Sequence, residues 1–185
     1  MKKFYDRERE MTQLLQMQRQ SYEDSSRFVV LTGRRRVGKT SLVCRLMEET
    51  KASAPGLYFF VGRKTEATLV RTFCDEVREK LGEYVPDGIT SFRSLFQLLL
   101  EIGRRRCFTL FIDEFQEFDR TNPGVYGDIQ HIWDEFHNKT KLNLVVNGSI
   151  NRLMNKIFCD DSQPLYGRNT GTLTLKPFST ALLKE

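Results

Sequence analysis

The stretch Gly33-Arg34-Arg35-Arg36-Val37-Gly38-Lys39-Thr40 decides the fold of this 185-residue chain, because it matches the pattern GxxxxGK[ST] at every constrained position. The apolar residues 28–31 directly before it predict a short buried strand. Residues 41–47 directly after it predict a helix with one apolar side. A strand, a glycine-containing loop and a helix in this order form the setting in which the pattern binds phosphate groups.

The loop residues have distinct roles in such a site. Two glycines let the backbone turn so that successive N–H groups point inward, and the start of the helix adds positive potential. Lys39 is then placed to reach the β- and γ-phosphates, and the Thr40 hydroxyl to ligate magnesium. The three arginine side chains are expected to point outward, since the backbone surrounds the phosphates. The residues predicted to hold the nucleotide are Gly33, Arg34, Arg35, Arg36, Val37, Gly38, Lys39, Thr40 and Ser41. The alternative is a surface turn beside a basic run; we favour a site for a nucleoside triphosphate.

The composition is that of a single globular domain over residues 1–185, with 39% hydrophobic and 29% charged residues. The net charge of +5 is modest and can serve the phosphates of a nucleotide as easily as those of a nucleic acid. The four cysteines match no metal-binding or CxxC pattern, so we expect reduced thiols. Charged residues follow the N-terminus where a signal peptide needs an apolar core, and no apolar run approaches the length of a membrane span. We therefore expect a cytoplasmic protein without a membrane partner.

Strands and helices are predicted to alternate along the chain. The predicted strands cover residues 28–32, 57–61, 108–112, 142–146 and 172–175. The predicted helices cover residues 7–20 and 39–51, a segment capped by Thr65, residues 91–104, a segment begun by Asn122-Pro123, and residues 150–157. This alternation predicts an α/β domain with a parallel sheet covered on both faces. The N-terminal helix segment spans residues 1–25 and the core spans 26–176.

Asp113-Glu114 provides a second group of candidate site residues, because a hydrophobic strand ends there downstream of the loop. An acid in this position holds magnesium in phosphate-transferring enzymes, so Asp113 is the predicted metal ligand together with Thr40. Glu114 is the predicted catalytic residue that orients or deprotonates the attacking water. A strand that simply ends in two solvated acids is the alternative. The acidic pair favours hydrolysis over transfer of phosphate to another substrate.

Two further polar residues follow later strands. Asn147 ends the strand after the acidic one, and its amide is placed to contact the γ-phosphate and the water together. Ser149 is the other polar group of this segment, and we expect it to cap the next helix. Arg168 follows that helix and is a candidate for stabilising transition-state charge, in cis or from a neighbouring subunit. A surface arginine is the alternative reading of Arg168.

These motifs together resemble a known family. The chain is similar to the archaeal-type ATPases of archaea and many bacteria, P-loop proteins close to the AAA+ and signal-transducing NTPase groups. Its segments that resemble the family's motifs are Phe4 to Glu10 (F-x-x-R-E-x-E), Leu31 to Ser41 (Walker A), Leu110 to Gln116 (Walker B, hhhDEhQ), Asn122-Pro123 with Gln130 and Trp133-Asp134, Gly148-Ser149 with Leu153-Met154, Pro164 to Arg168, and Leu175 to Phe178. The resemblance spans essentially the whole chain.

The resemblance implies a three-layer P-loop core with five parallel strands in the order 5-1-4-3-2, and ATP as the nucleotide. The chain departs from the family at Asn147, where relatives often carry a small or variable residue. Relatives also continue into a helical lid and a winged helix, whereas this sequence ends at Glu185. We expect these two parts to be absent, leaving either a stand-alone core or a fragment.

Two functions compete. The first is a magnesium-dependent ATPase core whose hydrolysis drives a conformational switch, with Lys39, Glu114, Asn147 and Arg168 as catalytic residues. The second is an ATP-binding scaffold or regulatory module with little hydrolysis. Glu114 favours the enzyme and the missing lid favours the scaffold. A homo-oligomer is expected if Arg168 acts on a neighbour's nucleotide, and nucleic acid enters as a partner only by analogy with relatives.

Overall fold

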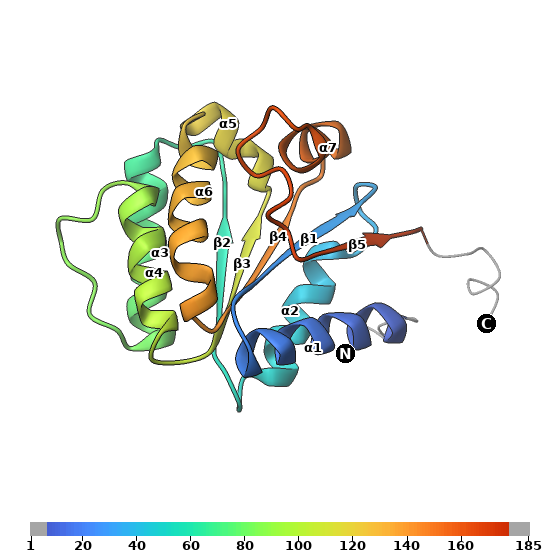
Figure 1. Cartoon of the computed structure of the whole chain (residues 1–185), viewed down its shortest axis with the longest axis horizontal. Coiled ribbons are helices and arrows are strands. Elements are labelled where there is room, and N and C mark those ends of the chain that lie inside the picture. Colours follow the sequence, from blue (N-terminus) through green and yellow to red (C-terminus); the bar gives the residue numbers. More distant parts are fainter. Residues whose placement is uncertain (1–6, 178–185) are drawn as a thin grey trace.

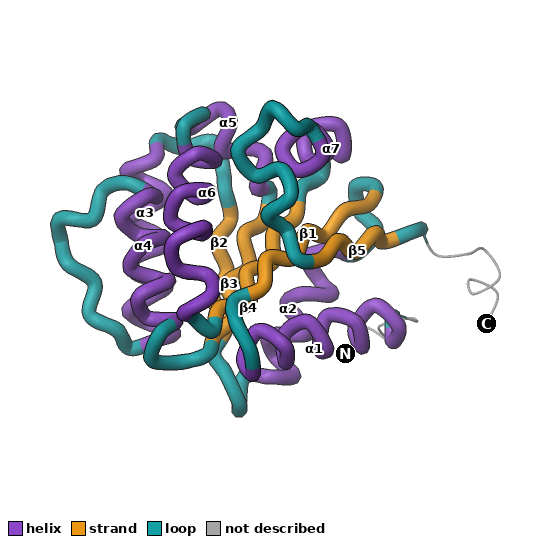
Figure 2. Tube along the Cα trace, in the orientation of Figure 1, coloured by secondary structure: helices purple, strands orange, loops and turns teal. Residues whose placement is uncertain are grey.

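Five parallel strands form one sheet in the computed structural model, which describes residues 7–177 (Figure 1). The strands are β1 (Arg27–Gly33), β2 (Gly56–Phe60), β3 (Phe108–Asp113), β4 (Leu142–Asn147) and β5 (Gly171–Leu175). Their spatial order is β2-β3-β4-β1-β5, which confirms the predicted order read from the opposite edge. Because all pairs are parallel, the carboxyl ends of the strands meet at one edge of the sheet. Figure 2 shows the strands of this sheet in orange and the helices around it in purple.

Helices cover both faces of the sheet, as the alternation predicted. One face carries α1 (Glu8–Glu23) and α2 (Lys39–Thr50); the other carries α3 (Glu66–Leu81), α4 (Phe92–Gly103), α6 (Val125–Phe136) and α7 (Asn151–Cys159). Alternate residues of β1 serve the two layers: Val29 and Leu31 pack with α1 and α2, whereas Phe28 and Val30 pack on the other side. The sheet is therefore buried on both faces, as a parallel sheet requires.

The short elements between β3 and α6 differ from the sequence prediction. The chain forms a 3₁₀ turn, η1 (Phe115–Glu117), and a short helix, α5 (Phe118–Thr121), and a second 3₁₀ turn, η2 (His137–Lys139), follows α6. The expectation that Asn122-Pro123 begins the next helix is wrong, because Asn122 is the C-terminal cap of α5 and α6 begins at Val125. The Asn122 side chain instead accepts a hydrogen bond from the Gly124 N–H at 3.0 Å. The expected cap Thr65 does accept a bond from the Thr68 N–H.

No helix between residues 7 and 177 is both long and apolar enough to cross a bilayer. The four cysteines are free thiols, as predicted, with Cys44 and Cys159 exposed.

A buried arginine joins the N-terminal helix to the glycine-containing loop. Arg7, directly before α1, is 6% exposed and donates to the carbonyl oxygens of Val37 at 3.0 Å and Lys176 at 2.8 Å. It also pairs with Glu10 at 3.0 Å. Val37 lies inside the loop after β1, and Lys176 directly follows β5. Arg7 therefore connects the start of α1 to this loop and to the end of β5. Phe4 and Tyr5, which belong to the same sequence motif, lie outside the described residues.

Replacing Arg7 with alanine should destabilise the fold, because the carbonyl groups and Glu10 would lose a buried charged donor. We expect a loss of about 3 kcal/mol in the free energy of unfolding, measured by chemical denaturation. Arg9→Ala is the matched control, since Arg9 is exposed on the same helix, and it should change stability by less than ~0.5 kcal/mol. Equal stability of the two variants would contradict a structural role for Arg7.

Candidate functional site

The loop after β1 has the backbone conformation that the glycines were predicted to allow. Gly33 has φ = 138°, and a Cβ atom there would lie 2.5 Å from the Leu175 carbonyl oxygen. No other residue fits at this point without moving β5. Arg36 also has a positive φ, 65°, which the sequence did not predict. Val37 is buried beneath the loop and anchors it to the apolar layer of α1 and α2.

Lys39 is buried under the loop and faces it. The side chain belongs to a residue only 7% exposed, and its Nζ donates to the carbonyl oxygens of Gly33 and Arg34, each at 2.9 Å. Burial lowers the pKa of Lys39 from its ordinary value, and the nearby carboxylates of Glu114 and Asp113 partly offset this. A further negative charge at this position would favour the charged ammonium still more. The site is therefore suited to an anionic ligand.

Asp113 joins three segments at the carboxyl edge of the sheet. Its Oδ2 accepts hydrogen bonds from the Thr40 hydroxyl at 2.9 Å and the Tyr58 hydroxyl at 2.8 Å. Its Oδ1 accepts from the Glu114 N–H at 2.9 Å. The two predicted metal ligands, Thr40 and Asp113, are thus in direct contact. Asp113 is 5% exposed, so these three donors replace the water that a buried carboxylate has lost.

Tyr58 is a site residue that no sequence motif predicted. It lies on β2, the edge strand beside β3, and its neighbours Leu57 and Phe59 are fully buried. Burial and the bond to Asp113 raise the pKa of the Tyr58 phenol, so the hydroxyl keeps its proton and acts as a donor. The only sequence signal was a polar hydroxyl within an apolar strand that the implied sheet order places beside the acidic one.

Glu114 directly follows β3 in a left-handed conformation, with φ = 56°. Its Oε2 accepts a hydrogen bond from Gln116 Nε2 at 2.5 Å and another from the Ser149 hydroxyl at 2.7 Å. The expectation that Ser149 caps the next helix is wrong. Ile150 precedes the first turn of α7, and no side chain caps that helix. Ser149 bonds to the candidate catalytic carboxylate instead.

Asn147 ends β4 with its amide next to Glu114. The residue is 1% exposed, and its Oδ1 accepts from the Glu114 N–H at 3.3 Å. This contact fixes which end of the amide faces Glu114. The amide nitrogen, Nδ2, is buried and has no hydrogen-bond partner among residues 7–177. A buried donor without a partner is costly, so this atom fits an acceptor that a ligand would bring.

Most of the predicted site residues line one cavity of about 270 Å³ at the carboxyl edge of the sheet. Its lining is Arg35, Arg36, Gly38, Lys39, Thr40, Ser41, Asp113, Glu114, Asn147 and Ser149. Gly33 and Val37 are buried under the loop, and Arg34 is exposed outside the lining. Arg35 and Arg36 are exposed, as predicted, yet they also border the cavity.

Arg168 lies apart from this cavity. Its guanidinium binds Asp134 of α6 through Nε at 3.1 Å and Nη2 at 2.9 Å. The following Thr170 N–H donates to the carbonyl of Phe28, near the amino end of β1. Strands rise by about 3.3 Å per residue, so roughly 16 Å of β1 separates this point from Gly33. Arg168 is therefore not placed to act on a ligand in the cavity of its own chain.

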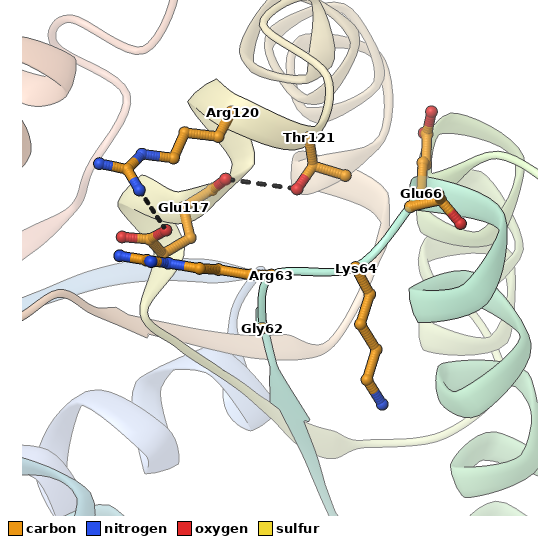
Figure 3. Close-up of a pocket in the computed structure, with 8 residues that line it drawn as sticks. Gly62, Arg63, Lys64, Glu66, Glu117, Arg120 and Thr121 are labelled. Carbon is orange, nitrogen blue, oxygen red and sulfur yellow. Dashed lines mark hydrogen bonds and ion pairs between the residues drawn. The ribbon is translucent and has the colours of Figure 1, made fainter.

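A second pocket, of about 650 Å³, lies between the loop after β2 and the segment after β3 (Figure 3). It is lined by Gly62, Arg63, Lys64, Thr65, Glu66, Glu117, Arg120 and Thr121. Its charges are mixed, and Arg120 pairs with Glu117 at 3.9 Å. It has no lining residue in common with the first cavity.

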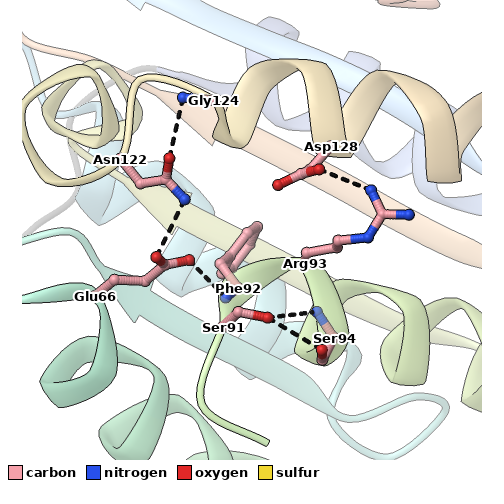
Figure 4. A network of polar contacts seen from close by, with 8 residues as sticks. All are labelled: Glu66, Ser91, Phe92, Arg93, Ser94, Asn122, Gly124 and Asp128. Atoms are coloured by element: carbon pink, nitrogen blue, oxygen red, sulfur yellow. Dashed lines mark hydrogen bonds and ion pairs between the residues drawn. The ribbon is translucent and has the colours of Figure 1, made fainter.

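Glu66, which lines this second pocket, connects α3 to the start of α4 and to the residue after α5 (Figure 4). Its carboxylate accepts from the Phe92 N–H at 2.9 Å and from the Asn122 amide at 3.1 Å. Arg93 and Asp128 join α4 to α6 nearby, at 2.7 Å. The loop after β2 and the segment after β3 are thus held by one polar network.

The five-stranded parallel sheet and the glycine-containing loop after β1 define a fold of the P-loop NTPase class. Residues 4–185 match the sequence profile of a family described as an ATPase domain predominantly from Archaea. The chain belongs to this family, as the motif resemblance predicted. An uncharacterized protein of Methanocaldococcus jannaschii, MJECL04, is 29% identical over 183 residues, which cover 98% of this chain and 38% of that protein.

Solved structures share the fold. The Walker-type ATPase PABY2304 of Pyrococcus abyssi superposes with a TM-score of 0.69 at 23% identity, over 97% of this chain and 55% of that one. The Aeropyrum pernix ORC2 protein, solved in ADPNP and ADP complexes, gives 0.70 at 13% identity, over 98% of this chain and 50% of that one. The Aeropyrum pernix ORC1 protein, solved with DNA, gives 0.62 at 19% identity, over 96% and 47%. The chain thus spans about half the length of these solved relatives.

Lys39→Ala should weaken ATP binding by about tenfold or more, a loss of at least ~1.4 kcal/mol. The reason is that Lys39 is the buried ammonium facing the loop, and charge-assisted contacts to phosphate are strong. Titration calorimetry measures the affinity. Lys51→Ala, at the exposed end of the same helix, is the control and should bind as wild type does. Unchanged ATP affinity in a folded Lys39→Ala protein would contradict the assignment of this loop to the nucleotide-binding site.

Proposed function

We propose that this chain hydrolyses ATP in a magnesium-dependent reaction within the first cavity, and that hydrolysis drives a conformational switch. The observation that carries this proposal is the convergence of Lys39, Thr40, Asp113 and Glu114 on one cavity. A site that only bound nucleotide would need the loop and a metal ligand. It would have no use for a second carboxylate held beside the first.

The residues present fit a magnesium ion. Thr40 and Asp113 supply a hydroxyl and a carboxylate oxygen, the hard ligands that Mg²⁺ takes together with phosphate and water. Their mutual hydrogen bond of 2.9 Å shows that both oxygens already reach the same point. Bound magnesium would neutralise charge that develops on the phosphates. Tyr58 holds Asp113 from the side of β2 and so keeps the carboxylate turned toward Thr40.

The other cavity residues have separate roles in the proposed reaction. Lys39 would bind phosphate oxygens in place of the loop carbonyls that it now contacts. Asn147 would donate through Nδ2, the buried atom without a partner, to an oxygen of the γ-phosphate. Glu114 would accept a proton from, or orient, the attacking water, which is the part of the reaction that a general base accelerates.

The second candidate function is an ATP-binding scaffold or regulatory module with little hydrolysis. One observation favours it: Arg168 is held by Asp134 away from the cavity of its own chain. An arginine at the γ-phosphate accelerates related reactions strongly, so a chain acting alone would turn over slowly. A neighbouring copy that supplies Arg168 would remove this limit and make the active form a homo-oligomer. A nucleic-acid partner would rest on likeness to the DNA-bound relative alone.

Asp113 and Glu114 should have separate roles, Asp113 in binding the metal and Glu114 in acting on the attacking water. Asp113→Asn should weaken magnesium-dependent ATP binding, whereas Glu114→Gln should bind ATP as wild type does and lose about 10²-fold or more in turnover. Calorimetry and a phosphate-release assay measure the two properties. Asp119→Asn, an exposed acid on the neighbouring α5, should leave both unchanged. Wild-type turnover in Glu114→Gln would place the catalytic carboxylate elsewhere, and equal loss of binding in both acidic variants would contradict the division.

Specific activity should rise with protein concentration if Arg168 acts on a neighbour's nucleotide. Arg168→Ala should then lower the rate at high concentration by up to ~10³-fold. Asp134→Ala is the matched variant, because it breaks the same ion pair while keeping the arginine, and it should retain activity. A flat concentration profile with an active Arg168→Ala protein would make Arg168 a surface residue. Equal losses in the two variants would show that only their ion pair matters.

A further inference from the structure

The carboxylate of Glu114 is held at one oxygen and left open at the other. Gln116 donates to Oε2 from η1 at 2.5 Å, and Ser149 donates to the same oxygen from the turn after β4 at 2.7 Å. Within residues 7–177, Oε1 has no hydrogen-bond donor. Two donors from two different strand ends therefore fix both the position and the rotation of one carboxylate.

The position of Gln116 is built into the fold. Gln116 is 1% exposed, and its Oε1 is buried without a partner among the described residues. A Cβ atom at residue 148 would lie 2.2 Å from this Oε1 and 2.5 Å from Met154 Sδ, so Gly148 makes the space that the amide fills. An apolar side chain of similar length would fill the same space without burying an unpaired oxygen. What favours an amide over an apolar side chain at this position is therefore its nitrogen, which donates to the Glu114 carboxylate.

Ser149 links the same carboxylate to the nucleotide-facing amide. Asn147 accepts from the Glu114 N–H, and Ser149, two residues later, donates to the Glu114 carboxylate. The short segment 147–149 thus contacts Glu114 at its backbone and at its side chain.

We propose that Gln116 and Ser149 are positioning residues for the catalytic carboxylate. They hold Oε2 of Glu114 so that Oε1 remains to accept a hydrogen bond from the attacking water. Neither residue touches the reacting atoms in this account. The inference rests on the proposed hydrolysis, since it assigns these two side chains a role in that reaction. Small displacements of a positioned group cost large factors in rate, which is why two donors are used.

The test compares turnover with ATP affinity in variants that remove each donor. Gln116→Met keeps the volume of the side chain, and Ser149→Ala removes only the hydroxyl. Each should lower turnover about tenfold, and the double variant should approach Glu114→Gln, because a general base contributes about 10²-fold or more in all. ATP affinity should stay within about twofold of wild type, or ~0.4 kcal/mol. Ser149→Thr restores a hydroxyl and should recover most of the turnover.

Matched controls exist elsewhere in the chain. The Ser162 hydroxyl donates to the Asp160 carboxylate at 2.7 Å on the surface, and Gln97 donates to Glu101 at 3.2 Å along α4. Ser162→Ala and Gln97→Met remove the same kinds of contact without touching the cavity. Both should hydrolyse ATP at the wild-type rate.

A second readout does not depend on activity. In the nucleotide-free protein, the side-chain amide protons of Gln116 should give a downfield ¹H–¹⁵N NMR signal, because one of them bonds to a carboxylate. This signal should move upfield in Glu114→Ala, while the signal of Gln97 stays in place. An unchanged chemical shift of the Gln116 amide in Glu114→Ala would contradict the contact on which the inference depends.

The outcomes separate this inference from the proposed function. Wild-type turnover in both Gln116→Met and Ser149→Ala, in a protein that does hydrolyse ATP, would overturn the positioning role alone. Faster turnover in either variant would overturn it too, since the donors would then restrain the carboxylate. Parallel losses of turnover and ATP affinity would reduce the pair to structural residues. A wild-type protein that binds ATP without hydrolysing it would instead overturn the proposed function, and the inference with it.

Discussion

The site depends on the carboxylate of Asp113, which is buried at the carboxyl edge of the sheet and satisfied by three donors. Thr40 reaches it from the loop after β1, Tyr58 from β2, and the Glu114 N–H from the start of the next turn. A buried charge without such partners would be too costly to keep. The same requirement therefore brings the phosphate-binding loop, the edge strand and the acidic turn to one point.

A second set of contacts builds outward from this point. Glu114 leaves β3 in a left-handed conformation, and its backbone and carboxylate are both held from the segment after β4. Since β3 and β4 are neighbours in the sheet, their carboxyl ends can hold one another without help from any covering domain. The proposed chemistry is thus set by strand adjacency, and Lys39 supplies the buried positive charge beside it. Arg7 fixes the loop from behind.

The sequence predicted the alternation of elements and the glycine-containing loop, because periodic apolar residues and a motif with four constrained positions are local signals. The order of the strands in the sheet was implied only by the resemblance to the family. It predicted Asp113 and Glu114 for the same reason. Tyr58 and Gln116 were missed, since a partner on an adjacent strand or in a 3₁₀ turn leaves no spacing pattern. Ser149 was assigned to a helix cap because caps are the common use of serine there, whereas a tertiary contact with Glu114 prevailed. The side-chain partner of Arg168 likewise lies 34 residues away.

The most direct test is a crystal structure of the chain with magnesium and a non-hydrolysable ATP analogue. We predict that Thr40 and Asp113 exchange their mutual hydrogen bond for contacts to the magnesium site, and that Lys39 leaves the loop carbonyls for the phosphates. Asn147 Nδ2 should then donate to the γ-phosphate, with Glu114 still bonded to Gln116 and Ser149. A nucleotide bound elsewhere, or an Asp113 that keeps its bond to Thr40 beside a bound triphosphate, would contradict the account.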